Sequence, residues 1–359
     1  MVQDFIDFDY INKKDKELTS KFLFFKNVKK YILGINKLTK SILKHIEVDG
    51  IVDDFTRVQS SRRKKDIFQI EDIPKDSIIL WTSSGSPLEV KNKLDAMGFE
   101  NISYLAFYKY SGLELAKPPF IVDFKNDYLA NKSRYDEIYN ILADEKSKDV
   151  FTKVINFKIS FDFEFMNGFT NDFKGQYFDE ELIPKIKDIV FLDGGGYIGD
   201  TIPNIIENFP DFKKIYVVEP SELHIGIAKK EFGHLKNIEF INCGLGSIKS
   251  NSIIIQDKQD TCNHNYQAEN LNTIDNIITQ KVDFIKLDIE GAEQDAIDGA
   301  KKTIKNYKPI LAICIYHKAE DWYKIPQKVL EINSDYKIYI RHYMEGIFET
   351  VMYFIPKNK

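Results

Sequence analysis

The stretch VFLDGGGYIGD, residues 190–200, is the most informative part of the sequence. An apolar run ends at Asp193, and three consecutive glycines follow it. Glycine permits a tight turn at which a side chain would be costly. The stretch therefore predicts a strand that turns through a glycine loop into a helix, which is the first unit of a sheet of alternating strands and helices.

The residues after this loop continue the same alternation. Strands are expected at residues 189–193, 214–219, 237–242, 282–288, 309–315, 336–341 and 350–355. Helix-length segments follow the first, second, fourth and fifth of these strands, as in a parallel sheet. No such segment separates the last two, so they should form a hairpin whose last strand is antiparallel to its neighbours. The prediction is an α/β fold with a Rossmann-like seven-stranded sheet.

The rest of the chain divides into three parts before this domain at residues 188–359. Residues 1–27 form a lead-in segment, residues 28–115 a smaller Rossmann-like α/β domain, and residues 116–187 a helical connector with entry helices. In the smaller domain the loop after the first strand keeps Gly34, but Asn36 and Thr39 replace the other two glycines of a dinucleotide-binding loop. Their side chains would obstruct a pyrophosphate, which favours a scaffold or acceptor-recognition role over a bound nucleotide.

Composition limits the classes of partner. A formal net charge of −5 gives no general attraction to nucleic acid or to an anionic membrane. No apolar run reaches the roughly 20 residues of a membrane span, and the acidic N-terminus does not fit a secretory signal. The three cysteines are widely spaced and odd in number, which argues against a disulfide framework. We expect a cytoplasmic protein with no nucleic-acid partner, and a homo-oligomer is compatible with the sequence.

The glycine loop fits two patterns of ligand binding. Gly194-x-Gly196-x-x-Gly199 spells the loop of a dinucleotide-binding enzyme. Asp193-x-Gly195-x-x-x-Gly199 instead fits a loop that holds S-adenosylmethionine. The glycine spacing alone does not separate these two hypotheses.

The acidic residues at the strand ends favour the second hypothesis. Ligands of an open parallel sheet bind at the carboxyl ends of its strands, and here those ends carry Asp193, Glu219, Asp288 and Glu290. At roughly 4 to 6 Å, like charges disfavour one another by one to a few kcal/mol in a partly buried cleft, which opposes a pyrophosphate. S-adenosylmethionine carries a sulfonium and an ammonium group, so an acidic edge suits it.

Several segments resemble the FkbM family of class I S-adenosylmethionine-dependent methyltransferases over residues 189–354. They are VFLDGGGYIGDT, IYVVEPS, VDFIKLDIEGAEQDAIDGAKKTI, PILAICIYHKAEDWYKIP, and RHY with the later ETVMYF. The resemblance implies a class I fold and methylation of a hydroxyl group on a sugar or small natural product. The last segments look like those of bacterial members encoded with surface-polysaccharide genes. This family commonly has Val-Gly-Ala-Asn where residues 194–197 read Gly-Gly-Gly-Tyr, and we expect the extra glycines to make the loop more flexible.

The resemblance also implies roles for the residues at the strand ends. Asp193, Gly195 and Gly199 would hold the methionine part of the cofactor, Glu219 the ribose, Asn242 and Cys243 the adenine, and Asp288 would lie nearest the methyl group.

Transfer to a hydroxyl group requires a base, because the hydroxyl proton must leave as the new bond forms. His317 follows the strand at residues 309–315 and is the first candidate, with Asp288 beside it as a second catalytic group. His342 ends the sixth strand, so it should reach the same edge roughly 10 Å away, two strand spacings, as a base or an acceptor contact. Glu290, His264 and Arg341 are assigned to acceptor binding. Asp288, Glu290 and His317 could also ligate a divalent metal, but no metal-binding spacing occurs, so a metal is not favoured.

The leading hypothesis is an S-adenosylmethionine-dependent O-methyltransferase that acts on a sugar or sugar-derived hydroxyl in bacterial capsular or lipopolysaccharide biosynthesis. Its acceptor would be a nucleotide sugar or a polysaccharide. Two alternatives stay open: an NAD-dependent oxidoreductase that uses the Gly-x-Gly-x-x-Gly pattern, and a non-catalytic module that binds a glycan precursor.

Overall fold

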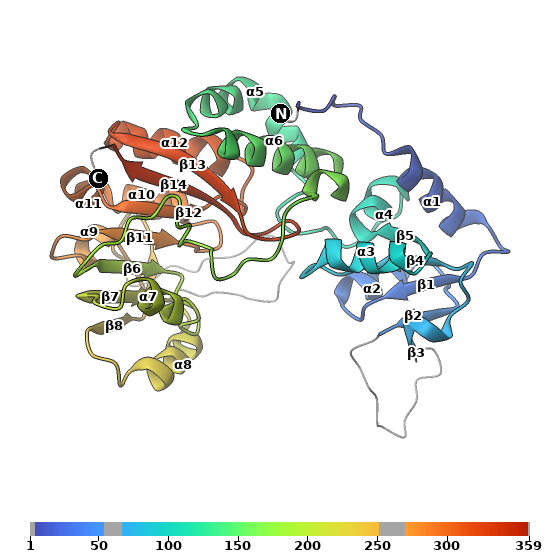
Figure 1. Cartoon of the computed structure of the whole chain (residues 1–359), viewed down its shortest axis with the longest axis horizontal. Helices are drawn as coiled ribbons and strands as arrows, with labels where there is room; N and C mark the ends of the chain where they lie inside the picture. The colour runs from blue at the N-terminus through green and yellow to red at the C-terminus, as the bar shows by residue number, and fades with distance from the viewer. Residues whose placement is uncertain (1–3, 54–66, 251–269, 358–359) are drawn as a thin grey trace.

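The structure is a computed structural model that describes residues 4–53, 67–250 and 270–357. Its two main sheets lie in two lobes, the smaller sheet in the N-terminal lobe and the larger in the C-terminal lobe (Figure 1). The strand order is β3-β2-β1-β4-β5 in the first sheet and β13-β14-β12-β11-β6-β7-β8 in the second. The predicted α/β fold, with a seven-stranded sheet preceded by a smaller parallel sheet, is confirmed.

The N-terminal lobe is a parallel sheet with short helices. Its strands are β1 (Lys30–Leu33), β2 (Gly50–Val52), β3 (Ile67–Phe68), β4 (Ile78–Trp81) and β5 (Glu100–Ser103). Its helices are α1 (Lys13–Phe24), α2 (Lys37–Ile42), the 3₁₀ helix η1 (Ile70–Asp72), α3 (Pro87–Ala96) and α4 (Tyr104–Tyr110). Helix α1 buries Leu18 and Phe22 in the same cluster as Ile32 and Leu80 of the sheet. Helix α1 of the predicted lead-in therefore packs as part of this lobe, whereas Phe5 and Phe8 pack against the core of the C-terminal lobe.

Three helical segments join the two sheets: α5 (Phe124–Ile141), α6 (Glu145–Ser160) and the 3₁₀ helix η2 (Phe163–Met166). The Asp144 side chain accepts a hydrogen bond from the Ser147 N–H at 2.7 Å, which satisfies an otherwise free donor at the start of α6. Helix α6 buries Val154 and Ile155 in the cluster that covers one face of the larger sheet. Helix α6 of the predicted connector is thus a structural part of the C-terminal lobe, whereas Phe163 and Phe165 of η2 pack in a cluster with the N-terminal sheet.

The C-terminal lobe holds the larger sheet. Its strands are β6 (Val190–Gly194), β7 (Lys214–Val218), β8 (Ile238–Ile241), β11 (Phe284–Leu287), β12 (Ile310–Cys314), β13 (Tyr336–His342) and β14 (Thr350–Pro356), with a small separate pair, β9 (Gly244–Leu245) and β10 (Leu271–Asn272). Its helices are α7 (Ile202–Asn208), α8 (Glu222–Phe232), α9 (Ile274–Ile277), α10 (Glu293–Asp298), α11 (Lys301–Tyr307) and α12 (Asp321–Ile332). None of the helices in the described residues is long and apolar enough to cross a membrane.

The side chains of the larger sheet alternate between two cores. Leu192, Ile285 and Ile313 share one core with α5, α6 and α12. Phe191, Phe284 and their neighbours on the opposite face form the other core with α7 and residues 177–183. Both faces are covered, as a parallel sheet requires, so a ligand can reach this sheet only at its edges and strand ends.

Strand β14 lies between β12 and β13 and runs antiparallel to both. A strand that runs opposite to its neighbours begins at the edge of the sheet where those neighbours end. Glu349, which precedes β14, therefore lies at the same edge of the sheet as the residues that follow β11 and β12.

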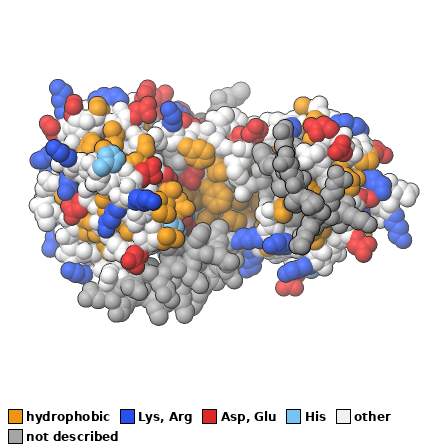
Figure 2. All heavy atoms as spheres, turned by 90° about the horizontal axis from the view of Figure 1, so that it is seen from below, with side chains coloured by type: hydrophobic (Ala, Val, Ile, Leu, Met, Phe, Trp, Pro, Cys, Tyr) orange, Lys and Arg blue, Asp and Glu red, His pale blue; other side chains and the backbone are white. Residues whose placement is uncertain are grey.

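The loop between β13 and β14 also connects the two lobes. The Glu345 carboxylate in this loop accepts hydrogen bonds from the N–H groups of Leu88 and Glu89, both at 3.0 Å, at the start of α3. A carboxylate at this position also interacts favourably with the helix dipole. Seen from below, hydrophobic side chains gather where the two lobes meet (Figure 2).

Candidate active site

The glycine loop packs closely against the ends of its neighbouring strands. The N–H groups of Gly195 and Gly196 both donate to the Val218 carbonyl at 3.0 Å. Gly195 has a φ of 77°, in the left-handed region that favours glycine. A Cβ atom there would overlap the carbonyl oxygen of Asp288. The loop is therefore held against the end of β11, with no space for a side chain at Gly195.

Gly194 and Gly196, the other two glycines of the run, also have no space for a side chain. A Cβ at Gly194 would lie 2.8 Å from side-chain atoms of both Leu245 and Leu287, and one at Gly196 would overlap Val217. The sequence predicts that these glycines make the loop more flexible. In the structure these glycines allow close packing inside the lobe, and the greater flexibility stays a prediction.

Asp193, the penultimate residue of β6, is a fully buried carboxylate. Its Oδ1 atom lies 2.9 Å from Nζ of Lys286, which also donates to the Gly195 carbonyl at 2.8 Å. Burial raises the pKa of Asp193, and Lys286 opposes that shift. The Oδ2 atom of Asp193 has no hydrogen-bond partner among the residues that the structure describes. Lys286 was not predicted from the sequence, and its cation neutralises part of the acidic edge.

Glu219 lies beside the glycine loop, as the sequence predicts. Its carboxylate accepts hydrogen bonds from the N–H groups of Tyr197, at 3.1 Å, and Ser221, at 2.9 Å. The Asn242 side chain donates to the Glu219 carbonyl at 3.0 Å. Cys243 is buried, and burial raises the pKa of its thiol to about 11. These residues line the part of the edge next to β7 and β8.

Asp288 is the centre of a second group of side chains at this edge. The hydroxyl groups of Tyr177 and Tyr316 donate to its two oxygens at 3.0 and 3.1 Å. Burial would raise the pKa of Asp288, but His317, Lys286 and the tyrosine hydroxyls together lower it. Asp288 therefore remains ionised and held in one orientation.

His317 lies between three carboxylates. Its Nδ1 atom is 3.1 Å from Glu293, and its Nε2 atom is 3.5 Å from Asp288 and 3.6 Å from Glu290. Burial would lower the pKa of His317, but Glu293 first, and then Asp288 and Glu290, raise it to about 9. The imidazole thus carries a proton at neutral pH. A protonated imidazole is the wrong starting state for the general base that the sequence suggests.

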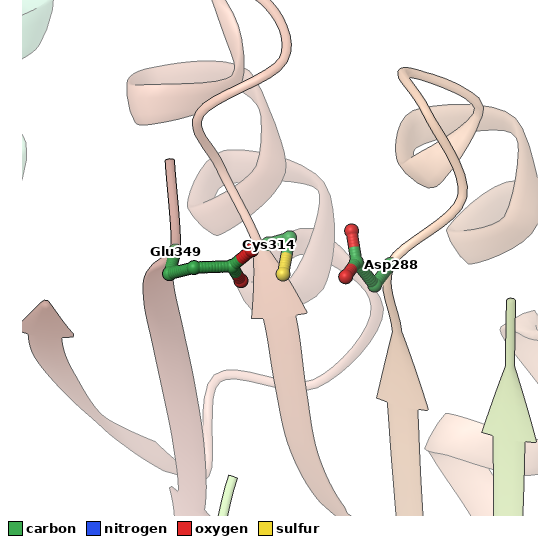
Figure 3. A group of neighbouring side chains, drawn as sticks. All are labelled: Asp288, Cys314 and Glu349. Carbon is green, nitrogen blue, oxygen red and sulfur yellow. The ribbon is translucent and has the colours of Figure 1, made fainter. Parts of the chain in front are cut away.

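Glu349 completes this group and was missed by the sequence analysis. Figure 3 shows its carboxyl group and that of Asp288 directed toward each other across the end of β12, with Cys314 between them. One ligand atom from each of these residues lies within 4.8 Å of the others. The Gln176 side chain donates a hydrogen bond to Glu349. Burial, and then the charge of Asp288, raise the pKa of Glu349 to about 7.

The same three side chains have the donor types of a metal site, as do Asp288, Glu293 and His317. A metal on the first set would have to displace the thiol proton of Cys314, whose pKa burial raises well above its usual value. Two cations, Lys286 and the protonated His317, already face Asp288. The group is therefore better suited to holding a proton than a divalent ion.

His342 does not join this group. Side chains alternate along a strand, and His342 shares its face with Ile340, whereas Glu349 faces the opposite side with Val351. The His342 ring pairs with the Thr350 hydroxyl at 2.9 Å. Burial lowers its pKa to about 3. The predicted position at the carboxyl edge is correct, but strand alternation directs the side chain into the other core and away from the face of Asp288 and Glu349, so its predicted catalytic role stays a prediction.

Arg341, a further predicted acceptor contact, is not brought to Asp288 either. Arg341 is buried, with its guanidinium 2.8 Å from Asp144 and 3.0 Å from Asp179. It therefore connects β13 to the start of α6 instead of facing the carboxyl edge. His264 lies outside the described residues. Of the two predicted acceptor residues that the structure describes, Glu290 lies beside His317 and Arg341 does not.

The parallel sheet with a final antiparallel hairpin, and the glycine loop at the carboxyl edge, define the class I methyltransferase fold. Residues 193–340 match the model of the Methyltransferase FkbM domain, so the chain contains a methyltransferase domain of the FkbM family. The methyl donor of this family is S-adenosylmethionine. The dinucleotide interpretation of the glycine loop is therefore wrong.

A solved structure shows the same fold over most of the chain, and others match it over about half. The structure of Methyltransferase FkbM from Methylobacillus flagellatus KT is 23% identical, with a TM-score of 0.75, over 96% of this chain and 94% of that chain. Aeropyrum pernix fibrillarin in complex with S-adenosyl-L-methionine is 13% identical, with a TM-score of 0.32, over 48% of this chain and 69% of that chain. No curated protein matches the sequence. The first of these similarities extends to both lobes.

Proposed function

We propose that the protein methylates a hydroxyl group on a sugar or sugar-derived acceptor, in the synthesis of a bacterial capsular polysaccharide or lipopolysaccharide. The acceptor would be a nucleotide sugar or a polysaccharide. The observation that carries the proposal is Asp288, an ionised carboxylate that two tyrosine hydroxyls hold beside the glycine loop. Such a carboxylate can accept a hydrogen bond from an acceptor hydroxyl and align its oxygen for transfer.

Aromatic side chains beside Asp288 support a sugar as the acceptor. The rings of Phe120 and Phe348 lie 5.9 and 6.0 Å from that of Tyr316, and each meets it edge-on. Rings of this kind offer apolar surface to the C–H faces of a sugar, while Asp288 and Glu290 offer acceptors to its hydroxyls. This combination of apolar and acidic groups suits the neutral sugar ring of an acceptor better than a phosphate or carboxylate group.

The residues beside the glycine loop fit the methyl donor. We assign the methionine part to Asp193, Gly195 and Gly199, because the buried Asp193 oxygen has no described partner and Gly195 packs against Asp288 at the same edge. Glu219 can accept hydrogen bonds from ribose hydroxyls, with Asn242 and Cys243 at the adenine end. When bound, S-adenosylmethionine supplies an electrophilic methyl group on a sulfonium.

The test is a methyl-transfer screen with tritium-labelled S-adenosylmethionine, against nucleotide sugars and demethylated surface polysaccharide. We expect label in an alkali-stable ether of at least one sugar. Asp288→Asn should reduce the transfer rate by roughly 100-fold, the scale of a positioned polar group. Label recovered only on nitrogen would reject the hydroxyl acceptor, and the absence of transfer to any acceptor would favour a non-catalytic binding module.

A further inference from the structure

We propose that Glu349 accepts the proton that the acceptor hydroxyl loses during methyl transfer, with Gln176 as its positioning residue. This inference depends on the proposed transfer to a hydroxyl group. It assigns the base to a residue at the start of an antiparallel strand, and not to the histidine that the sequence favours.

The position of Glu349 follows from the topology. Strand β14 pairs with β12 through Cys314 and Val351, so the residue just before β14 lies where β12 ends. Its side chain is on the same face of the sheet as those of Lys286 and Asp288, by the alternation of β11 and β14. Figure 3 shows the Glu349 carboxyl group directed at Asp288. A hydroxyl held by Asp288 would therefore lie within reach of Glu349.

The backbone conformation of Glu349 is an unfavourable one that the surrounding residues hold in place. Its φ of 65° lies in the left-handed region, which residues other than glycine rarely adopt. Its carbonyl accepts a hydrogen bond from the Tyr343 N–H at 3.0 Å, and its side chain accepts one from Gln176. Strained residues of this kind collect at active sites, where the surrounding structure holds them in place.

The charges around Glu349 suit a group that takes up a proton. The titratable groups that face it are Asp288, Lys286, His317, Cys314, Tyr177 and Tyr316. Lys286 pairs with Asp193, and His317 pairs with Glu293. Asp288 is held ionised by its neighbours, whereas Glu349, which faces it, has a pKa of about 7, near neutral pH. A base works best when its pKa is close to the working pH.

The proposed step leaves the net charge of the site unchanged. The acceptor oxygen bonds to the methyl carbon as the carbon–sulfur bond breaks, and the electron pair of that bond remains on sulfur. The oxygen–hydrogen bond breaks, and the proton passes to a carboxylate oxygen of Glu349. One positive charge on sulfur and one negative charge on Glu349 disappear together, so no new charge is left in a buried site where charges are costly. Transfer to a distant base would separate these charges.

Calorimetry tests this assignment without an acceptor. S-adenosylmethionine and S-adenosylhomocysteine are each titrated into the full chain at pH 7, in phosphate and in Tris, whose heats of ionisation differ. A sulfonium near Glu349 should lower its pKa, so the methyl donor should release a measurable fraction of a proton that the neutral thioether does not. Glu349→Gln should abolish this difference. An unchanged difference in that variant would overturn the proposal.

Two further variants complete the test. Glu345 lies in the same loop as Glu349, but its carboxylate contacts the start of α3. The control variant Glu345→Gln should therefore keep the wild-type proton release. Glu349→Asp keeps a carboxyl group and should retain some of that release, which guards against a folding defect in Glu349→Gln.

Once an acceptor is identified, Glu349→Gln should slow transfer by roughly 100-fold or more and remove the rise in rate between pH 6 and 8. A transfer rate and pH profile like those of the wild type would also overturn the assignment, whereas failure to find a hydroxyl acceptor would count only against the proposed function.

Discussion

The two sheets of this protein have similar parallel cores and very different carboxyl edges. In the N-terminal lobe, the edge between β1 and β4 is closed by neutral side chains. Asn36 donates to the Thr82 carbonyl at 3.1 Å, and the Thr39 hydroxyl donates to the Gly34 carbonyl at 2.7 Å. In the C-terminal lobe, the corresponding edge between β6 and β11 carries a glycine loop and the buried Asp193–Lys286 pair. At the N-terminal edge these polar groups hydrogen-bond to one another, whereas the C-terminal edge presents charged groups that a ligand can contact.

This difference shows that topology provides the position of a site and side chains decide its use. The N-terminal edge also faces the C-terminal lobe, because a pocket between them is lined by Trp81 and Thr82 from one lobe and Ile347 and Phe348 from the other. Phe348 precedes Glu349. We therefore propose that the N-terminal lobe supports the acceptor side of the active site and does not bind a nucleotide.

The largest expected effect is on the buried charge pair. Lys286→Met leaves Asp193 buried without its cation, which should lower the free energy of unfolding by about 3–5 kcal/mol. Lys281→Met is the matched control, because Lys281 pairs with Asp283 at 2.8 Å but is 63% exposed. The control should cost no more than about 1 kcal/mol. Urea unfolding measures the free energy of unfolding of both variants. Equal losses of free energy would show that the buried Asp193–Lys286 pair contributes no more to stability than an exposed ion pair.

A smaller, pH-dependent effect is expected at His317. Its folded-state pKa of about 9 lies above the unfolded value of about 6.5. The stability it contributes, up to about 3 kcal/mol, is therefore present below pH 6.5 and is lost as the pH rises through 9. His317→Gln should lack this component, so the two unfolding free energies should converge between pH 6.5 and 9. A constant difference across that range would mean that His317 is neutral in the folded protein.

The smallest effect is expected at the N-terminal edge. Asn36 caps α2 by accepting hydrogen bonds from the N–H groups of Leu38 and Thr39 at 2.9 and 3.1 Å. Asn36→Ala should cost about 1 kcal/mol of stability, with unchanged affinity for S-adenosylmethionine by calorimetry. Weaker cofactor binding in this variant would contradict the separation of the two edges.

Several features of the site could be predicted from the sequence because they depend on strand ends. Asp193, Asp288 and His317 each follow an apolar strand, and parallel strands end at one edge. Lys286 could have been found from its place inside a buried strand, where a charge requires a partner, and its register neighbour is Asp193. Glu349 precedes a strand, and it belongs to the edge only because β14 runs in the opposite direction.

Other features depended on contacts that no local pattern contains. His342 lies at the predicted edge, but strand alternation directs its ring into the opposite core. Arg341 pairs with Asp144 and Asp179, from segments more than 160 residues earlier in the chain. Such pairs form only after α6 and residues 170–183 pack against the sheet.

The sequence by itself determined the order of strands and helices, the antiparallel hairpin, the glycine loop and the acidic strand ends. These are local properties, since apolar periodicity and backbone freedom act over a few residues. Only the tertiary structure decided which of the acids are neutralised, which histidine carries a proton, and which carboxyl groups have a pKa near neutral pH. Those properties depend on burial and on charges a few ångströms away in space, and the residues responsible are far apart along the chain.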